Sequence, residues 1–215
     1  MDEPTLRRTL VDACRAMNAL GINQGTSGNI SVRHGATMLI SPSATPYDAM
    51  RADQVAAMPL DDAPGAEGWR GPLKPSTEWR FHRDILRARP DIGAVVHSHP
   101  TFCTTLAIAR RDIPACHYMV AAFGGADIRC ADYATFGTQE LSDHALRALE
   151  GRNGCLLANH GMIVCGPTLA RAMWLAVELE AIARQYYHSL LIGGPHLLSD
   201  AQIAETARKL STYGV

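Results

Sequence analysis

The spacing of apolar and polar positions along the chain predicts helices interleaved with short strands. An apolar face at helical spacing predicts a first helix over Pro4–Leu20, with Gly21 placed to end it. The same pattern predicts helices from Ser76 to near Pro90 and over Thr138–Leu149, Thr168–Leu191 and Asp200–Leu210. Short apolar runs predict strands at Ile30–Val32, Met38–Ile40, Gly93–His99, Cys155–Ala158 and Met162–Cys165. Such a mixture favours an α/β fold with a sheet covered by helices, although the pattern leaves the strand order open.

Length and composition favour one compact domain over residues 1–215. The net charge of -1 gives no electrostatic footprint for nucleic acid or an anionic membrane, and 47% hydrophobic residues exclude a disordered chain. No apolar run approaches the roughly 18 residues of a spanning helix. The acidic start is not typical of a signal peptide, so a cytoplasmic location is predicted. Residues Asp61–Gly68, rich in Gly, Ala and Asp, are interpreted as a surface turn.

Cysteine and lysine usage restrict the chemistry. Six cysteines without a CxxC pair are interpreted as buried hydrophobes, which argues against a disulfide framework and against a thiolate zinc site. Only Lys74 and Lys209 are lysines, and neither lies in an apolar segment that would desolvate its amine. A Schiff-base mechanism therefore has little support.

Three histidines stand at the ends of predicted strands. His97 and His99 are two residues apart after an apolar run, so both imidazoles point to the same face. His160 follows another apolar run in the same way. With Glu78 as the nearest candidate carboxylate, this set matches a catalytic zinc with positions left for substrate. The other six histidines lack this setting and are interpreted as surface or core residues.

Three segments rich in small and hydroxyl residues are suited to a phosphate group. They are Gly25–Asn29, Ser41–Ala44 and Ser76–Thr77, the last predicted to cap a helix at Ser76, where free N–H groups and the helix dipole favour an anion. Neither GxGxxG nor a P-loop occurs, which points to a small phosphorylated metabolite instead of a nucleotide.

Several longer motifs closely resemble the class II L-fuculose-1-phosphate aldolase family, which also includes the ribulose-phosphate 4-epimerases and the adducin head. They are Asn23–Arg33, Pro75–His82, Val96–His99, Ile113–Met119, Tyr133–Thr138 and Asn159–Gly161. The resemblance covers nearly the whole chain. It implies a three-layer α-β-α sandwich with a central, mostly antiparallel sheet, and a homotetramer whose active sites lie between subunits.

The resemblance also implies a role for individual residues. Zinc, with Mn²⁺ or Co²⁺ as alternatives, is held by His97, His99 and His160, and Glu78 is a ligand that becomes the acid/base once substrate displaces it. The residues on the family's phosphate-binding positions are Gly28, Asn29, Ser43, Ala44, Ser76 and Thr77. Phe136, Tyr118 and Tyr213 fall near the aldehyde end, with both tyrosines reaching a neighbour's site and acting as catalytic residues.

The implied reaction is reversible cleavage of a ketose 1-phosphate to dihydroxyacetone phosphate and a small aldehyde. L-Fuculose, 5-deoxyribulose and 5-methylthioribulose 1-phosphates all remain open as substrates. The alternatives are a 4-epimerase, which carries Asp at the position of Glu78, a sugar-acid phosphate decarboxylase, and an adducin-like module, which lacks the histidines. Ser43–Ala44 replaces the usual Thr-Gly, and Ser98 and Pro100–Phe102 also depart from the family pattern.

Overall fold

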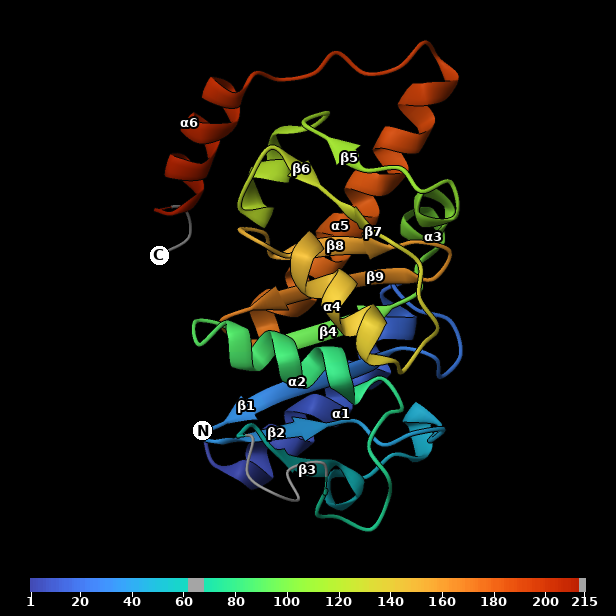
Figure 1. Cartoon of the computed structure of the whole chain (residues 1–215), viewed down its shortest axis with the longest axis vertical. Coiled ribbons are helices and arrows are strands. Elements are labelled where there is room, and N and C mark those ends of the chain that lie inside the picture. The colour runs from blue at the N-terminus through green and yellow to red at the C-terminus, as the bar shows by residue number, and fades with distance from the viewer. Residues whose placement is uncertain (62–67, 213–215) are drawn as a thin grey trace.

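A mixed seven-stranded sheet runs through the whole molecule, which is described by a computed structural model covering residues 1–61 and 68–212 (Figure 1). Its strand order is β3-β2-β1-β4-β9-β8-β7, and all neighbours are antiparallel except β7 and β8. The strands are β1 (Asn29–His34), β2 (Thr37–Ile40), β3 (Ala56–Pro59), β4 (Ala94–Ser98), β7 (Cys130–Ala131), β8 (Gly154–Leu157) and β9 (Gly161–Gly166). A separate two-stranded ribbon pairs β5 (Ile113–Pro114) with β6 (Asp127–Ile128).

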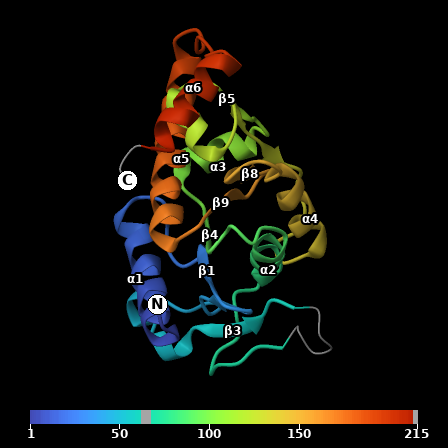
Figure 2. The same cartoon turned by 90° about the vertical axis from the view of Figure 1, so that its left-hand side faces the viewer.

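Helices cover both faces of this sheet (Figure 2). One layer contains α1 (Glu3–Ala19), α3 (Thr101–Ile108) and α5 (Leu169–Leu191), and the opposite layer contains α2 (Trp79–Ala88) and α4 (Gln139–Ala148). Each layer has its own apolar core, and strand alternation divides β4 between them: Val96 packs in the first and Val95 in the second. The predicted α-β-α sandwich with a mostly antiparallel sheet is therefore confirmed.

The remaining elements lie at opposite ends of the sandwich (Figure 1). α6 (Asp200–Leu210) packs against the 3₁₀ helix η3 (Tyr118–Phe123), while two shorter 3₁₀ helices, η1 (Tyr47–Ala49) and η2 (Ala52–Gln54), lie beside α1.

Glu180 of α5 accepts hydrogen bonds from the backbone N–H groups of Phe102 and Cys103. These bonds satisfy free donors at the start of α3 and thereby fix the chain that leaves β4.

Most predicted elements are confirmed within a few residues, and one helix start is corrected. α2 begins at Trp79, and Glu78 occupies its N-cap position without a side-chain capping bond. Ser76 is therefore not the N-cap; its hydroxyl accepts from the Glu78 N–H at 3.3 Å and makes a local turn before the helix. The predicted turn at Asp61–Gly68 falls largely on residues 62–67, outside the described part of the chain. β3, β7, α3 and the β5–β6 ribbon were not predicted.

Candidate metal centre and active site

The three predicted histidines meet where two neighbouring strands turn. His97 lies in β4 opposite Ile163 of β9, and His160 immediately precedes β9. Because β4 and β9 are antiparallel, the end of β4 lies beside the start of β9, which brings His160 to the pair His97 and His99. Ligand-type nitrogens of the three imidazoles all lie within 4.8 Å of one another. The structure thus brings together the three histidines that were predicted from their places at strand ends.

Glu78 completes this group from the opposite side. Glu78 is only 5% exposed, and its side chain enters from the chain just before α2. Oε2 lies 3.2 Å from Nε2 of His97, and Oε1 lies 3.3 Å from Nε2 of His160. Asn29 of β1, which is paired with His97 in the sheet register, donates from Nδ2 to Oε2 at 2.9 Å.

Burial and charge set the protonation of these groups. Burial alone raises the pKa of Glu78, but the facing His97 and His160 and the hydrogen bond from Asn29 together hold that pKa well below its usual range. Burial lowers the pKa of His99 to about 3 and that of His160 to about 4. At neutral pH the centre therefore holds an ionised Glu78 carboxylate and neutral His99 and His160 imidazoles, the forms that bind metals.

Two buried atoms in the centre show that its residues fit a metal ion. Within the described chain, Glu78 Oε1 and His97 Nε2 are both buried and have no hydrogen-bond partner. His97 Nδ1 donates to the Met162 carbonyl at 2.9 Å, which leaves the Nε2 lone pair directed at Glu78. Buried polar atoms are rarely left unsatisfied, and a cation between them would satisfy both. Three imidazoles and a carboxylate suit zinc in particular.

A cavity of about 320 Å³ opens beside the centre. Glu78, His99 and His160 form one side of it, and the rest is lined mainly by Ser27, Thr77, Tyr133, Phe136 and Asn159. Tyr133 and Asn159 were not predicted as site residues, although each stands in a motif that carries the family resemblance. The Ser27 hydroxyl is also hydrogen-bonded to His99 Nδ1 at 2.9 Å, and this bond orients the imidazole ring of His99.

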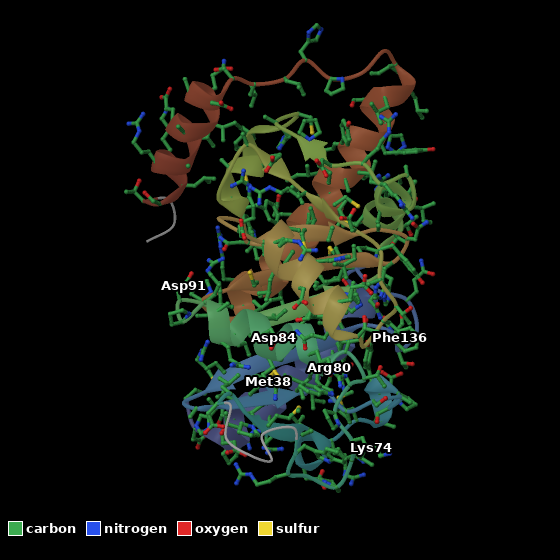
Figure 3. The ribbon with its side chains drawn as sticks, viewed as in Figure 1. Met38, Lys74, Arg80, Asp84, Asp91 and Phe136 are labelled. Atoms are coloured by element: carbon green, nitrogen blue, oxygen red, sulfur yellow. The ribbon has the colours of Figure 1, made fainter. Side chains whose placement is uncertain are left out.

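A hydrogen bond from α2 holds the aromatic side of the cavity, which is the side lined by Tyr133 and Phe136. Arg80, in the first turn of this helix, donates from Nη1 to the Gly137 carbonyl at 2.8 Å (Figure 3). Gly137 has a φ of 75°, and a Cβ there would lie 2.9 Å from the Thr77 carbonyl. The loop that carries Phe136 is therefore packed closely against the segment that carries Glu78.

Hydrogen bonds join the segments predicted to bind phosphate. Ser43 N–H donates to the Lys74 carbonyl, and Ser76 N–H donates to the Ser41 carbonyl, both at 3.0 Å. Gly28 fits only as glycine, since a Cβ would lie 2.9 Å from the His97 carbonyl. Ala44 has a φ of 49°, the left-handed region that the family's usual glycine adopts more easily. Gly28 and Asn29 lie against His97, and Thr77 lines the cavity beside the metal centre.

Of the three residues predicted near the aldehyde end, the structure describes two, and only one of those two lines the cavity. Phe136 lines the cavity and is 63% exposed. Tyr118, at the start of η3, is 52% exposed and is not among the residues that line this cavity in the described chain. Tyr213 lies outside the described residues.

The cysteines and lysines agree with metal chemistry. All six cysteines are free, and four of them are buried. Lys74 is exposed, and the exposed Lys209 pairs with Glu205, so neither amine is desolvated. No helix in the described residues is long and apolar enough to cross a membrane.

Residues 8–187 match the family model "Class II Aldolase and Adducin N-terminal domain". The chain belongs to this family. It is 53% identical over 209 residues to the 5-methylthioribulose-1-phosphate/5-deoxyribulose-1-phosphate aldolase of Rhodospirillum rubrum, covering 97% of this chain and 92% of the relative. It is 46% identical to the L-fuculose phosphate aldolase of Escherichia coli K12, covering 100% and 98%.

A solved structure supports the same assignment. The structure of an L-fuculose 1-phosphate aldolase superposes with a TM-score of 0.90 at 33% sequence identity, covering 95% of both chains. Class II aldolases depend on a metal, in agreement with the His97, His99 and His160 group of this family member.

Proposed function

We propose that this chain is a zinc-dependent aldolase that reversibly cleaves a ketose 1-phosphate between C3 and C4, giving dihydroxyacetone phosphate and a small aldehyde. The observation that carries the proposal is that two buried atoms, Glu78 Oε1 and His97 Nε2, lack hydrogen-bond partners within a three-histidine centre of the described chain. The metal, held by the three histidines and Glu78, supplies a Lewis acid for the ketose oxygens when bound.

The phosphate is held by the loops beside the centre. The segments that contain Gly28, Ser43–Ala44 and Ser76–Thr77 present backbone N–H groups and hydroxyls, and Asn29 borders them. Because these loops are hydrogen-bonded to each other, they fix the phosphate without rearrangement. The reacting carbons then lie between the phosphate loops and the aromatic wall of the cavity.

Glu78 moves the proton. Cleavage removes the proton of the C4 hydroxyl, which passes to solvent through the tyrosines at the aldehyde end, breaks C3–C4 with the electron pair left on C3, and releases the aldehyde. Glu78, which is ionised at rest, takes up a proton from solvent and delivers it to C3; in the condensation direction it takes that proton back. Tyr118 and Tyr213, contributed by a neighbouring subunit of a homotetramer, handle the proton at the aldehyde end.

The aldehyde side of the cavity favours an apolar substituent. Tyr133 and Phe136 supply two aromatic rings there, and the relative from R. rubrum acts on 5-methylthio and 5-deoxy ribulose 1-phosphates. We therefore place these two ketoses first and L-fuculose 1-phosphate second, the latter supported by the E. coli relative. Hydrophobic pockets separate such substrates by only about 1–3 kcal/mol per methylene-sized change, so overlapping activity is expected.

Two measurements test the proposal. Elemental analysis of protein purified without chelators is expected to find about one zinc per chain, in line with the one three-histidine centre found among the described residues. Comparison of kcat/KM for the three ketose 1-phosphates is expected to rank the two ribulose derivatives above L-fuculose 1-phosphate. Full activity in metal-free protein, or a product that retains its C3–C4 bond, as an epimerase or decarboxylase would give, overturns the assignment.

A further inference from the structure

A row of buried polar side chains runs from the sheet to Glu78 outside the substrate cavity. Ser31 of β1 and His82 of α2 are both fully buried, and neither lines the cavity. Ser31 Oγ lies 2.8 Å from His82 Nδ1, and His82 Nε2 lies 2.5 Å from Asn29 Oδ1. Asn29 in turn contacts Glu78. The row therefore ends on the residue proposed to carry the proton.

The Glu78 carboxylate at the end of this row determines which atom donates and which accepts in every hydrogen bond of the row. An ionised carboxylate only accepts, so Asn29 must present its NH₂ group to Glu78 and its Oδ1 to His82. His82 Nε2 must then carry the hydrogen, which leaves Nδ1 as an acceptor for the Ser31 hydroxyl. The opposite tautomer would place two acceptors face to face at 2.5 Å.

The surroundings of His82 keep it in this single neutral form. Burial, followed by the nearby His97, lowers the pKa of His82 to about 3, so the ring is uncharged under ordinary conditions. Phe81 stacks against the His82 ring at a centroid distance of 4.7 Å and also meets the edge of His97 at 5.3 Å. The ring therefore cannot flip without disturbing the core beneath the metal centre.

The two carboxylate oxygens of Glu78 differ in their hydrogen bonding. Oε2 is held by the amide of Asn29, whereas Oε1 has no hydrogen-bond partner among the described residues. A carboxylate anchored through one oxygen keeps the other in one place, ready to bind the metal or to transfer a proton.

We propose that Ser31 and His82 are positioning residues, which fix the orientation of the Asn29 amide so that Glu78 is anchored through Oε2 and exchanges protons through Oε1. The catalytic consequence rests on the proposed function of Glu78. The hydrogen-bond directions and the effect on metal affinity do not, because both are properties of the protein without substrate.

A purely structural role is the competing explanation. In that case Ser31 and His82 merely satisfy each other between β1 and α2, and their loss lowers stability without affecting the centre. Ser142 offers a matched control, because it is also fully buried and donates from its hydroxyl to Asp84 Oδ2 at 2.7 Å, on α4 and outside the row.

Four variants separate the two explanations. His82→Leu removes the donor to Asn29, Ser31→Ala removes the donor to His82, and Ser142→Ala removes an unrelated buried hydroxyl. His82→Gln keeps one N–H donor and one acceptor in a side chain of similar length, and serves as the conservative rescue. Zinc affinity is measured by competition with a chromophoric chelator, kcat and KM with the preferred ketose 1-phosphate, and the ring protonation of His82 by ¹⁵N NMR of metal-free protein.

The wild-type spectrum is expected to show His82 protonated at Nε2 and unprotonated at Nδ1. His82→Leu is expected to lose about 10–100-fold in zinc affinity or in kcat, the usual cost of removing a partner behind a metal ligand, while KM changes little. Ser31→Ala should show a smaller loss, His82→Gln should recover most of it, and Ser142→Ala should match wild type.

A wild-type His82 protonated at Nδ1 overturns the proposal, even if His82→Leu fails to fold. So do wild-type zinc affinity and kcat in a folded His82→Leu protein, or equal losses in Ser31→Ala and Ser142→Ala. If the wild-type protein turns over no ketose 1-phosphate, the proposed function fails, and the NMR and zinc measurements still decide the positioning role.

Discussion

Replacing Glu78 by Gln separates proton transfer from metal binding. Gln has the size of Glu but only one oxygen, and the Asn29 NH₂ group requires an acceptor at 2.9 Å. The variant's oxygen therefore turns to Asn29, and its NH₂ group takes the place of Oε1, 3.3 Å from His160 Nε2. An amide at that position does not shuttle a proton near neutral pH.

The expected changes in zinc content, turnover and stability follow from the groups that remain in the Glu78→Gln protein. Three histidines still hold the metal, so most of the zinc should be retained. Loss of a general acid/base slows turnover by about 10²–10⁴-fold, equivalent to a barrier increase of about 2.7–5.4 kcal/mol. Removing a helix cap would instead cost about 0.5–2 kcal/mol of stability, but Glu78 makes no side-chain capping bond, so little loss is expected by that route.

Three assays on the same preparation distinguish these effects. Elemental analysis reports the zinc content, and chemical denaturation reports the free energy of unfolding. Exchange of the dihydroxyacetone phosphate C–H proton with solvent, followed by NMR without aldehyde, isolates the proton transfer from C–C cleavage. Exchange and turnover are expected to fall in parallel.

One result refutes the reasoning. Near-normal proton exchange in a folded, zinc-loaded Glu78→Gln protein would remove Glu78 from the proton transfer. Tyr118 and Tyr213 would then be the next candidates for that step.

Three further predictions address the shared site, pH and the aromatic wall. Mixing inactive Tyr118→Phe subunits with inactive His97→Ala subunits should restore partial activity, and no recovery after proven subunit exchange would contradict a site shared between subunits. The pKa of His82 is about 3 when folded and about 6.5 when unfolded, so its stabilising contribution is complete above pH 6.5 and is lost as pH falls. Metal-free protein should be about 2 kcal/mol less stable at pH 5 than at pH 7 from this group alone, a slope that denaturation should find absent in His82→Gln. Arg80→Ala removes a charged hydrogen bond worth about 1.5–3 kcal/mol from the Phe136 loop, so kcat/KM should fall by about 10- to 100-fold with zinc content unchanged. An unaltered kcat/KM would show that this hydrogen bond is not needed to hold the loop.

The sequence by itself determined the longer elements and the candidate metal ligands. Helices such as α1 and α5 have clear apolar faces and end signals, and strand alternation alone places His97 and His99 on one side of β4. These features depend on neighbours a few residues apart, which is the range that a sequence pattern records. The apolar run before His160 and the helix start near Glu78 marked these two residues as partners from distant segments, and the family motifs gave each of them a role.

Several elements of two to four residues, namely β3, β7 and the β5–β6 ribbon, were not predicted from the sequence, because so short a segment shows no clear period. β7 is a strand only because β8 pairs with it, and β3 only because β2 does. α3 follows Pro100 directly, and its start is stabilised by Glu180 from α5, 78 residues away from Phe102. No local pattern contains such information.

Only the tertiary structure decided how Glu78 is held. The register that pairs Asn29 with His97 brings β1 beside the metal centre and lets Asn29 reach both Glu78 and His82. From the sequence, His82 was simply one of six histidines without a functional setting. Its donor direction is determined by a carboxylate two hydrogen bonds away, and a constraint of that kind exists only once the chain has folded.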